Sequence, residues 1–95
     1  MVQVEAHLFA TFKAIAGKNK IILEVLPGQT IEDACFALLT SLPMLRSHWL
    51  DMNGQLQQYV HVYLNQSDSA TLPNGMLTEL QDGDILDFIP PVAGG

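Results

Sequence analysis

The sequence has few of the residues that cross-link proteins and few that carry positive charge. One cysteine in 95 residues excludes an internal disulfide and any zinc site built from several cysteines. Four lysine and arginine residues stand against ten aspartate and glutamate residues, which gives a formal net charge of −6. Such a surface would repel the phosphates of a nucleic acid, so we expect no nucleic-acid partner. It favours instead a protein partner with a basic docking face.

Long hydrophobic runs and catalytic motifs are also lacking. The first residues alternate, as Met-Val-Gln-Val-Glu, unlike a secretory leader or a membrane span, so we expect a cytoplasmic chain with no membrane partner. The sequence has no glycine-rich phosphate loop, nucleophile elbow, Cys-x-x-Cys pair or helical histidine pair. We therefore expect a protein that is not an enzyme and that binds no metal and no cofactor of its own.

The apolar residues that are present alternate in several short stretches. They make up 48% of the chain, enough for the core of one domain spanning residues 1–95. Period-2 alternation predicts strands over Val2–Phe9 and Tyr59–Leu64, with Phe9 pointing away from the core. A strand over Ile21–Val25 and a terminal strand after Gly83 complete the set. The expected core side chains include Val4, Leu8, Leu38, Val62, Leu64, Leu86 and Phe88.

One main helix is predicted over Thr30–Leu42. Thr30 is a suitable N-cap, and Glu32 and Asp33 place negative charge in the first turn, where the helix dipole favours it. Pro43 should end the helix. Apolar residues recur along one face at helical spacing: Ile31, Ala34, Cys35, Leu38, Leu39 and Leu42. On that stripe Cys35 is expected to be a buried small hydrophobe rather than a reactive thiol that relays sulfur.

The remaining segments are read more coarsely. A short helical turn is expected over Thr11–Ala16, closed by Gly17. Residues 44–58 show no clear period, and we expect apolar side chains there (Met44, Leu45, Trp49 and Leu50) to cover one end of the core. Met76, Leu77 and Leu80 are expected to lie under the sheet. Two strand spacings, roughly 10 Å, should separate His7 from His61, which is too far for the two to share a metal ion. We therefore interpret both as polar residues of an open sheet face.

The last residues form an unusual tail over residues 90–95. Pro90 and Pro91 lack N–H donors and should end strand pairing and direct the chain outward. Val92 and Ala93 are small, and Gly94 and Gly95 have no Cβ, so this end could enter a narrow passage. Chain ends are often frayed and idle, but this composition suits a carboxylate that is presented inside another protein's active site.

Three pieces of the sequence carry a resemblance to a known family. They are the ending Pro-Pro-Val-Ala-Gly-Gly after Asp82-Gly83-Asp84, the stretch Phe9–Gly17, and the segment Val62-Tyr63-Leu64-Asn65. Together they resemble the MoaD/ThiS family of ubiquitin-like sulfur carriers, and most closely its MoaD branch. Lys13 and Ala14 stand where that branch has arginine and glutamate.

The resemblance agrees with the element order and implies a fold and a chemistry. The order strand, strand, helix, strand, strand matches an α+β β-grasp, a mixed sheet of four to five strands with one main helix on one face. The resemblance implies that the first and last strands are parallel central neighbours. It also implies that Gly95, preceded by Gly94, is adenylated by an ATP-dependent, ubiquitin-activating-like adenylyltransferase (MoaB/MoeB/ThiF type) and converted to a thiocarboxylate with a sulfurtransferase.

Partner contacts are expected on the open face and along the tail. Phe9, Tyr63 and Ile89 should lie near one another on adjacent strands and form a docking surface. From there the tail residues Pro90, Pro91, Val92 and Ala93 would lead into the partner. For the MoaD branch the receiver is the large subunit of molybdopterin synthase (MoaE type), so molybdopterin biosynthesis is the favoured pathway.

Other pathways and two other functions stay open. Relatives with the same tail deliver sulfur to cysteine, thiamine or tRNA. Some relatives are instead modifiers joined to target lysines, here through Gly95, which is the second possible function. A plain interaction domain with an incidental Gly-Gly is the third possibility. The chain has only three lysines of its own (Lys13, Lys18 and Lys20), which leaves few sites for building chains of modifiers.

Overall fold

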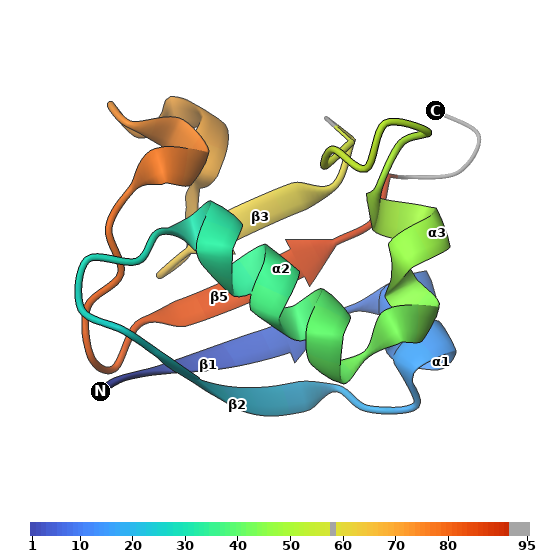
Figure 1. Ribbon diagram of the computed structural model, residues 1–95, viewed down its shortest axis with the longest axis horizontal. Coiled ribbons are helices and arrows are strands. Elements are labelled where there is room, and N and C mark those ends of the chain that lie inside the picture. The colour runs from blue at the N-terminus through green and yellow to red at the C-terminus, as the bar shows by residue number, and fades with distance from the viewer. Residues whose placement is uncertain (58, 92–95) are drawn as a thin grey trace.

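The computed structural model describes residues 1–57 and 59–91 and shows a five-stranded mixed sheet with helices on one face (Figure 1). In chain order the elements are β1 (Val2–Leu8), α1 (Ala10–Ala16), β2 (Lys20–Val25), α2 (Ile31–Ser41), α3 (Arg46–Trp49), β3 (His61–Leu64), β4 (Ser67–Asp68) and β5 (Ile85–Ile89). Single 3₁₀ turns occur at Pro43–Leu45, Ser69–Thr71 and Gly75–Leu77. This is the β-grasp architecture expected from the sequence.

The sheet order is β2-β1-β5-β3-β4. β1 runs antiparallel to β2 and parallel to β5, which pairs Leu8 with Phe88. β3 runs antiparallel to β5 and pairs Val62 with Phe88. The last strand therefore lies at the centre of the sheet, between the first strand and the third, as the resemblance implied.

The helix α2 crosses one face of the sheet, and its start is well specified. The Thr30 side chain accepts a hydrogen bond from the Asp33 N–H, and the Asp33 carboxylate accepts one from the Thr30 N–H, which forms a capping box. All six residues of the predicted apolar stripe are buried (Ile31, Ala34, Cys35, Leu38, Leu39 and Leu42). The shorter α1 ends at Gly17, whose φ of 72° is the left-handed conformation expected of a glycine cap.

Most predicted core residues are buried, with three corrections. Val4, Leu8, Leu38, Val62, Leu86 and Phe88 are at most 2% exposed, whereas Leu64 is only half-buried. Met44 and Leu77 were expected to cover the core, but they are 46% and 64% exposed. Both lie in 3₁₀ turns, whose three-residue period leaves few side chains facing the core. Leu45 and Leu80, which were expected to be in the core with them, are buried as predicted.

No helix in residues 1–57 and 59–91 is both long enough and apolar enough to cross a bilayer.

Candidate functional site

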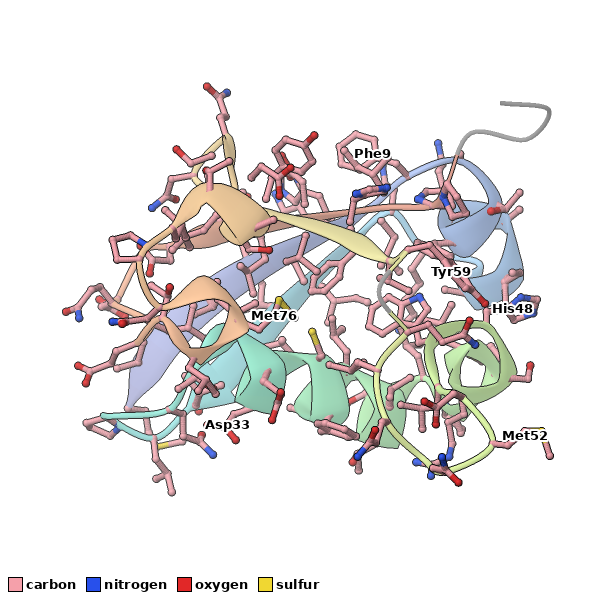
Figure 2. All side chains as sticks on the ribbon, turned by 90° about the horizontal axis from the view of Figure 1, so that it is seen from above. Phe9, Asp33, His48, Met52, Tyr59 and Met76 are labelled. Atoms are coloured by element: carbon pink, nitrogen blue, oxygen red, sulfur yellow. The ribbon has the colours of Figure 1, made fainter. Side chains whose placement is uncertain are left out.

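The open face of the sheet brings together the residues Phe9, Tyr63 and Ile89, here called the docking patch. The Phe9 N–H donates to the Phe88 carbonyl at 3.2 Å, which continues the β1–β5 register and sets Phe9 beside Ile89. Tyr63 pairs with Asp87, two residues before Ile89 on the same face, so Tyr63 and Ile89 are diagonal neighbours. Phe9 is 42% exposed, and Figure 2 shows it on the side of the sheet opposite α2. Tyr63 and Ile89 are half-buried.

The backbone after β1 explains why Phe9 stays at the surface. Phe9 is extended, with φ −117° and ψ 155°, and its carbonyl accepts hydrogen bonds from the N–H groups of Phe12 and Lys13. Ala10 has a φ of 50°, a left-handed conformation that costs a non-glycine residue about 1–2 kcal/mol. This sharp turn lets α1 begin at once and holds the Phe9 ring at the end of β1, beside the strand that carries Ile89.

The two prolines after β5 differ in exposure. Pro90 is buried, which corrects its expected place on an accessible contact surface, whereas Pro91 is exposed. A proline ring without an N–H can pack at the end of a strand and stop further pairing there. Pro91 is thus the first exposed residue after β5. The predicted tail residues Val92, Ala93, Gly94 and Gly95 lie outside the described residues.

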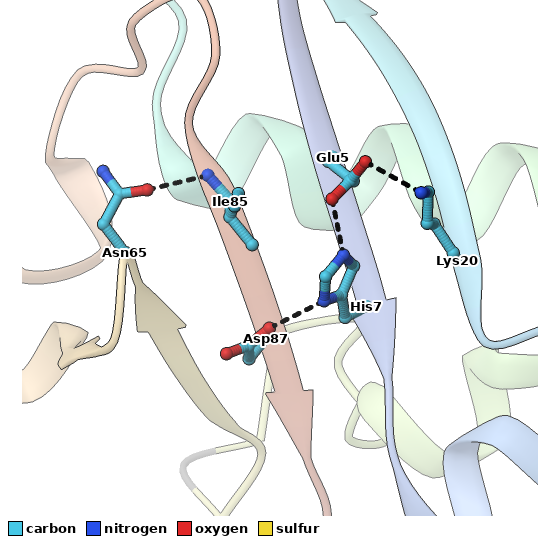
Figure 3. Close-up of polar contacts among 6 residues, drawn as sticks. All are labelled: Glu5, His7, Lys20, Asn65, Ile85 and Asp87. Carbon is cyan, nitrogen blue, oxygen red and sulfur yellow. Dashed lines mark hydrogen bonds and ion pairs between the residues drawn. The ribbon is translucent and has the colours of Figure 1, made fainter.

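A row of ionisable side chains crosses the same face next to the patch (Figure 3). His7 Nε2 lies 2.7 Å from a Glu5 carboxylate oxygen, and His7 Nδ1 lies 3.3 Å from Asp87 Oδ1. The other Glu5 oxygen is 3.3 Å from the Lys20 ammonium. The hydrogen bond with His7, with the one from Lys20 next, lowers the pKa of Glu5 below its ordinary value. The contact between His7 Nδ1 and Asp87 Oδ1 is within ion-pair distance but is not a hydrogen bond. Asp87 Oδ1 is buried and has no hydrogen-bond partner within residues 1–57 and 59–91.

Sequence reasoning missed this row because it depends on the parallel pairing of β1 with β5. His7 and Asp87 are paired residues of strands that are far apart in the sequence. The separation of His7 from His61 was predicted correctly, since β5 lies between their strands. Within the described part of the chain, no three histidine, cysteine, aspartate or glutamate side chains are grouped so as to hold a metal ion.

Asn65 holds the start of β5 in place. Its side-chain oxygen accepts a hydrogen bond from the Ile85 N–H at 2.9 Å, and its amide nitrogen donates to Asp84 Oδ1 at 3.0 Å. Its own N–H donates to the Ile85 carbonyl at 2.8 Å. Asparagine tolerates the φ of 48° found here better than most residues do. The sequence had singled out this asparagine only through the resemblance of Val62-Tyr63-Leu64-Asn65, without a physical role.

A family model described as the ThiS family matches residues 6–95, nearly the whole chain. The chain belongs to the ThiS family. This ThiS-family chain is 32% identical over 94 residues to small archaeal modifier protein 3 of Haloferax volcanii, a match that covers 99% of this chain and 100% of the relative. The names of its relatives describe modifiers and carriers rather than catalysts.

A structure and a second relative support the same assignment. The crystal structure of SAMP1 from Haloferax volcanii has a TM-score of 0.88 to this chain at 30% identity, and the match covers 98% of this chain and 99% of that one. The sulfur carrier protein CysO of Mycobacterium tuberculosis is 38% identical over 42 residues, 44% of either chain. The ThiS-family chain therefore has the fold of ubiquitin-like carriers and modifiers.

The one thiol of the ThiS-family chain is not a second reactive centre. Cys35 is fully buried on α2, as predicted. Burial raises the pKa of its thiol to about 12, and the nearby Glu32 carboxylate adds to the rise. At neutral pH the group is therefore a protonated, shielded thiol rather than a nucleophilic thiolate.

Lys13, which replaces the arginine of the MoaD branch, keeps a cation beside the docking patch. It lies on α1 and is exposed, and it lines a shallow hollow of about 270 Å³ together with Phe9, Asn19 and Lys20. Ala14, at the position of the branch's glutamate, is exposed on the next residue of α1. Among the residues that the structure describes, Lys13 forms no ion pair.

Proposed function

We propose that this chain is a sulfur carrier whose C-terminal Gly95 is adenylated and then converted to a thiocarboxylate. One observation carries the proposal: Ile89 of the docking patch ends β5, and the ThiS family model matches the chain through residue 95, which includes the Gly-Gly ending. A partner that binds the patch is therefore positioned to receive the residues that follow Pro91. Gly95 has no side chain, so both faces of its carbonyl are open to attack.

The chemistry needs a partner because a carboxylate is a poor electrophile. The Gly95 carboxylate attacks the α-phosphorus of ATP in an ubiquitin-activating-like adenylyltransferase and releases pyrophosphate, which gives an acyl-adenylate. Hydrosulfide (HS⁻), released from a sulfurtransferase, then attacks the carbonyl carbon and displaces AMP, and loss of the S–H proton leaves the thiocarboxylate. The resulting thiocarboxylate is an anionic sulfur nucleophile at neutral pH, and its delivery depends on orientation by the receiving protein.

For the receiving pathway we propose molybdopterin biosynthesis, with this chain as the small subunit of molybdopterin synthase. The support is the sequence resemblance to the MoaD branch in Phe9–Gly17, in Val62–Asn65 and in the ending. The partner would then be a large subunit of the MoaE type. Sulfur delivery to cysteine, thiamine or tRNA uses the same first two steps, and the match to CysO favours the first of these.

A specific observation also favours a second function, that of a protein modifier. Two relatives that match along their entire length are named small archaeal modifier proteins, 3 and 1, of Haloferax volcanii. A modifier uses the same activated Gly95, but a lysine amine of a target protein attacks the carbonyl in place of sulfur. The docking patch and the activation step would serve both functions equally.

The test is to incubate the purified chain with ATP, a sulfide source and its cognate activating enzyme, and to measure the intact mass. The expected result is replacement of one oxygen by sulfur at Gly95. Deleting Gly95 leaves the carboxylate one residue short, by about 3.5 Å, and should abolish the gain. Cys35→Ala is the matched control, because a buried thiol off the reaction path should leave the gain unchanged.

Two other outcomes would contradict the proposal. If the chain gains no sulfur but is found joined to lysines in extracts of its host, the modifier function is correct and the carrier function is wrong. If neither product forms with any activating enzyme of the host, the Gly-Gly ending is incidental.

A further inference from the structure

The sheet has one long edge with unpaired backbone groups. β2 is the outermost strand on its side, and no described element lies beyond it in Figure 1. The opposite edge is β4, only Ser67–Asp68, which is too short to pair with another strand over any length. The six residues of β2 are therefore the edge at which another strand could be added.

The register of β2 identifies the groups that point outward. The Leu8 N–H donates to the Asn19 carbonyl, so this pair exchanges hydrogen bonds across the β1–β2 ladder. Such pairs alternate with pairs that do not exchange them, so Ile21, Leu23 and Val25 also bond to β1. The N–H and C=O groups of Lys20, Ile22 and Glu24 are the ones that face away from the sheet.

These three residues are complementary to themselves. When two copies of β2 run antiparallel about a two-fold axis at Ile22, Lys20 of each copy faces Glu24 of the other, and Ile22 faces its own equivalent. The three facing pairs are all of the hydrogen-bonded kind, so the outward backbone groups of both edges are satisfied together. All three side chains are exposed, and they lie on the open face, where Ile22 pairs with Glu5.

We propose that the β2 edge is an interaction surface for a second copy of this chain, which extends two five-stranded sheets into one. The argument is charge complementarity: opposite charges meet at both ends of the pairing and an apolar pair lies at its centre. Ile22 is 48% exposed in the single chain and would be covered. This proposal is independent of the carrier or modifier function, because the docking patch lies on β1, β5 and β3 and stays open.

Two features oppose the pairing and set its strength. Each copy carries a net charge of −6, so the copies repel each other at long range. Lys20 also contacts Glu5 of its own chain at 3.3 Å, but the Lys20 side chain is 57% exposed and such surface pairs are weak. A lysine on an edge commonly prevents pairing; here the facing Glu24 would neutralise it. We therefore expect a weak, concentration-dependent dimer.

A charge-exchange experiment tests this arrangement. The mass of the wild-type chain is measured by sedimentation equilibrium from about 10 μM to about 1 mM, a range that covers weak association. In Lys20→Glu each copy carries carboxylates at positions 20 and 24, and in Glu24→Lys each copy carries ammonium groups there. Like charges would then face each other across the dimer, so each variant alone should dissociate at least tenfold more readily than the wild type. An equimolar mixture of the two should dimerise again, and so should the double variant. Arg46→Glu, on α3, and Glu79→Lys change the net charge equally, away from this edge, and should leave association unchanged.

Amide hydrogen exchange gives a second readout. The N–H groups of Ile22 and Glu24 should exchange more slowly as the concentration rises, whereas those of Ile21 and Leu23 are already protected by β1. The proposal is overturned if the wild-type chain stays at 10.4 kDa throughout the range. It is also overturned if the mixture of the two charge variants associates no better than either variant alone.

Discussion

Trp49 stacks on Phe88, with ring centroids 4.8 Å apart and ring planes inclined by 19°. Phe12 adds an edge contact to Trp49 at 5.5 Å and 68°. Both members of the stacked pair are fully buried. The pair joins α3, in the part of the sequence with no readable period, to the central strand that leads to Ile89 of the docking patch.

The first prediction concerns this pair. Trp49→Ala removes the largest buried side chain and both aromatic contacts, so it should lower the free energy of unfolding by about 3–5 kcal/mol. Urea denaturation followed by circular dichroism measures the change. Met44→Ala, in the same segment but 46% exposed, is the control and should stay within about 0.5 kcal/mol of the wild type. A small loss at Trp49 would mean that α3 is not part of the cooperative core.

The second prediction concerns Asn65. Replacement by alanine removes the hydrogen bonds to Ile85 and Asp84 and places a less tolerant residue at φ 48°, so it should cost about 2 kcal/mol. Asn65→Gly loses the same hydrogen bonds but adopts this φ without strain, and it should cost less than alanine. Thermal unfolding of the three proteins gives the order. If alanine and glycine were equivalent, the conformation of Asn65 would not matter to stability.

The third prediction concerns the docking patch. Phe9→Ala and Ile89→Asp should each weaken binding to the cognate activating enzyme by about 1–3 kcal/mol, as expected for residues at the centre of an interface. Isothermal titration calorimetry measures the affinity, and circular dichroism checks that the fold is kept. Leu77→Ala removes another exposed apolar side chain, far from the patch in the sequence, and should bind normally. Unchanged affinity in both patch variants would place the docking surface elsewhere.

The fourth prediction concerns pH. The pKa of Glu5 is lowered in the folded protein, so near the ordinary pKa of 4.5 the folded state binds fewer protons than the unfolded state. The stabilisation from Glu5 is therefore present above the ordinary value of 4.5 and is lost as the pH falls through the lower, folded value. Glu5→Gln should flatten the decline in stability below about pH 4.5. Thermal midpoints measured from pH 7 to pH 2.5 test this.

The regular elements could be predicted because their patterns are local. Alternation from Val2 to Leu8 and the stripe from Ile31 to Leu42 depend only on the periods of a strand and a helix. Burial of Trp49 could be guessed from its size, but the choice between Met44 and Leu45 depended on a 3₁₀ turn that the sequence does not signal. The row formed by Glu5, His7 and Asp87 required the pairing of distant strands, which no local pattern contains.

The candidate site was anticipated unevenly for the same reason. The grouping of Phe9, Tyr63 and Ile89 followed from the family resemblance, which supplied the strand order, and the register places Phe9 and Tyr63 on either side of the strand that carries Ile89. The burial of Pro90 was not foreseen, because proline chemistry predicts the end of strand pairing but not which side of the chain the ring covers. The role of Asn65 was missed, since an asparagine in a loop has many possible partners.

The central position of β5 has a consequence for quality control. β5 pairs with β1 on one side and with β3 on the other. The sheet is therefore complete only when β5 has been synthesised and has paired with β1, which lies about 80 residues earlier in the sequence. In a chain that is incompletely synthesised or misfolded, Phe9 and Ile89 are far apart and the docking patch does not exist. If the activating enzyme recognises the patch, as we propose, it would leave such a chain unactivated, and under the proposed carrier function only a fully folded molecule would receive sulfur.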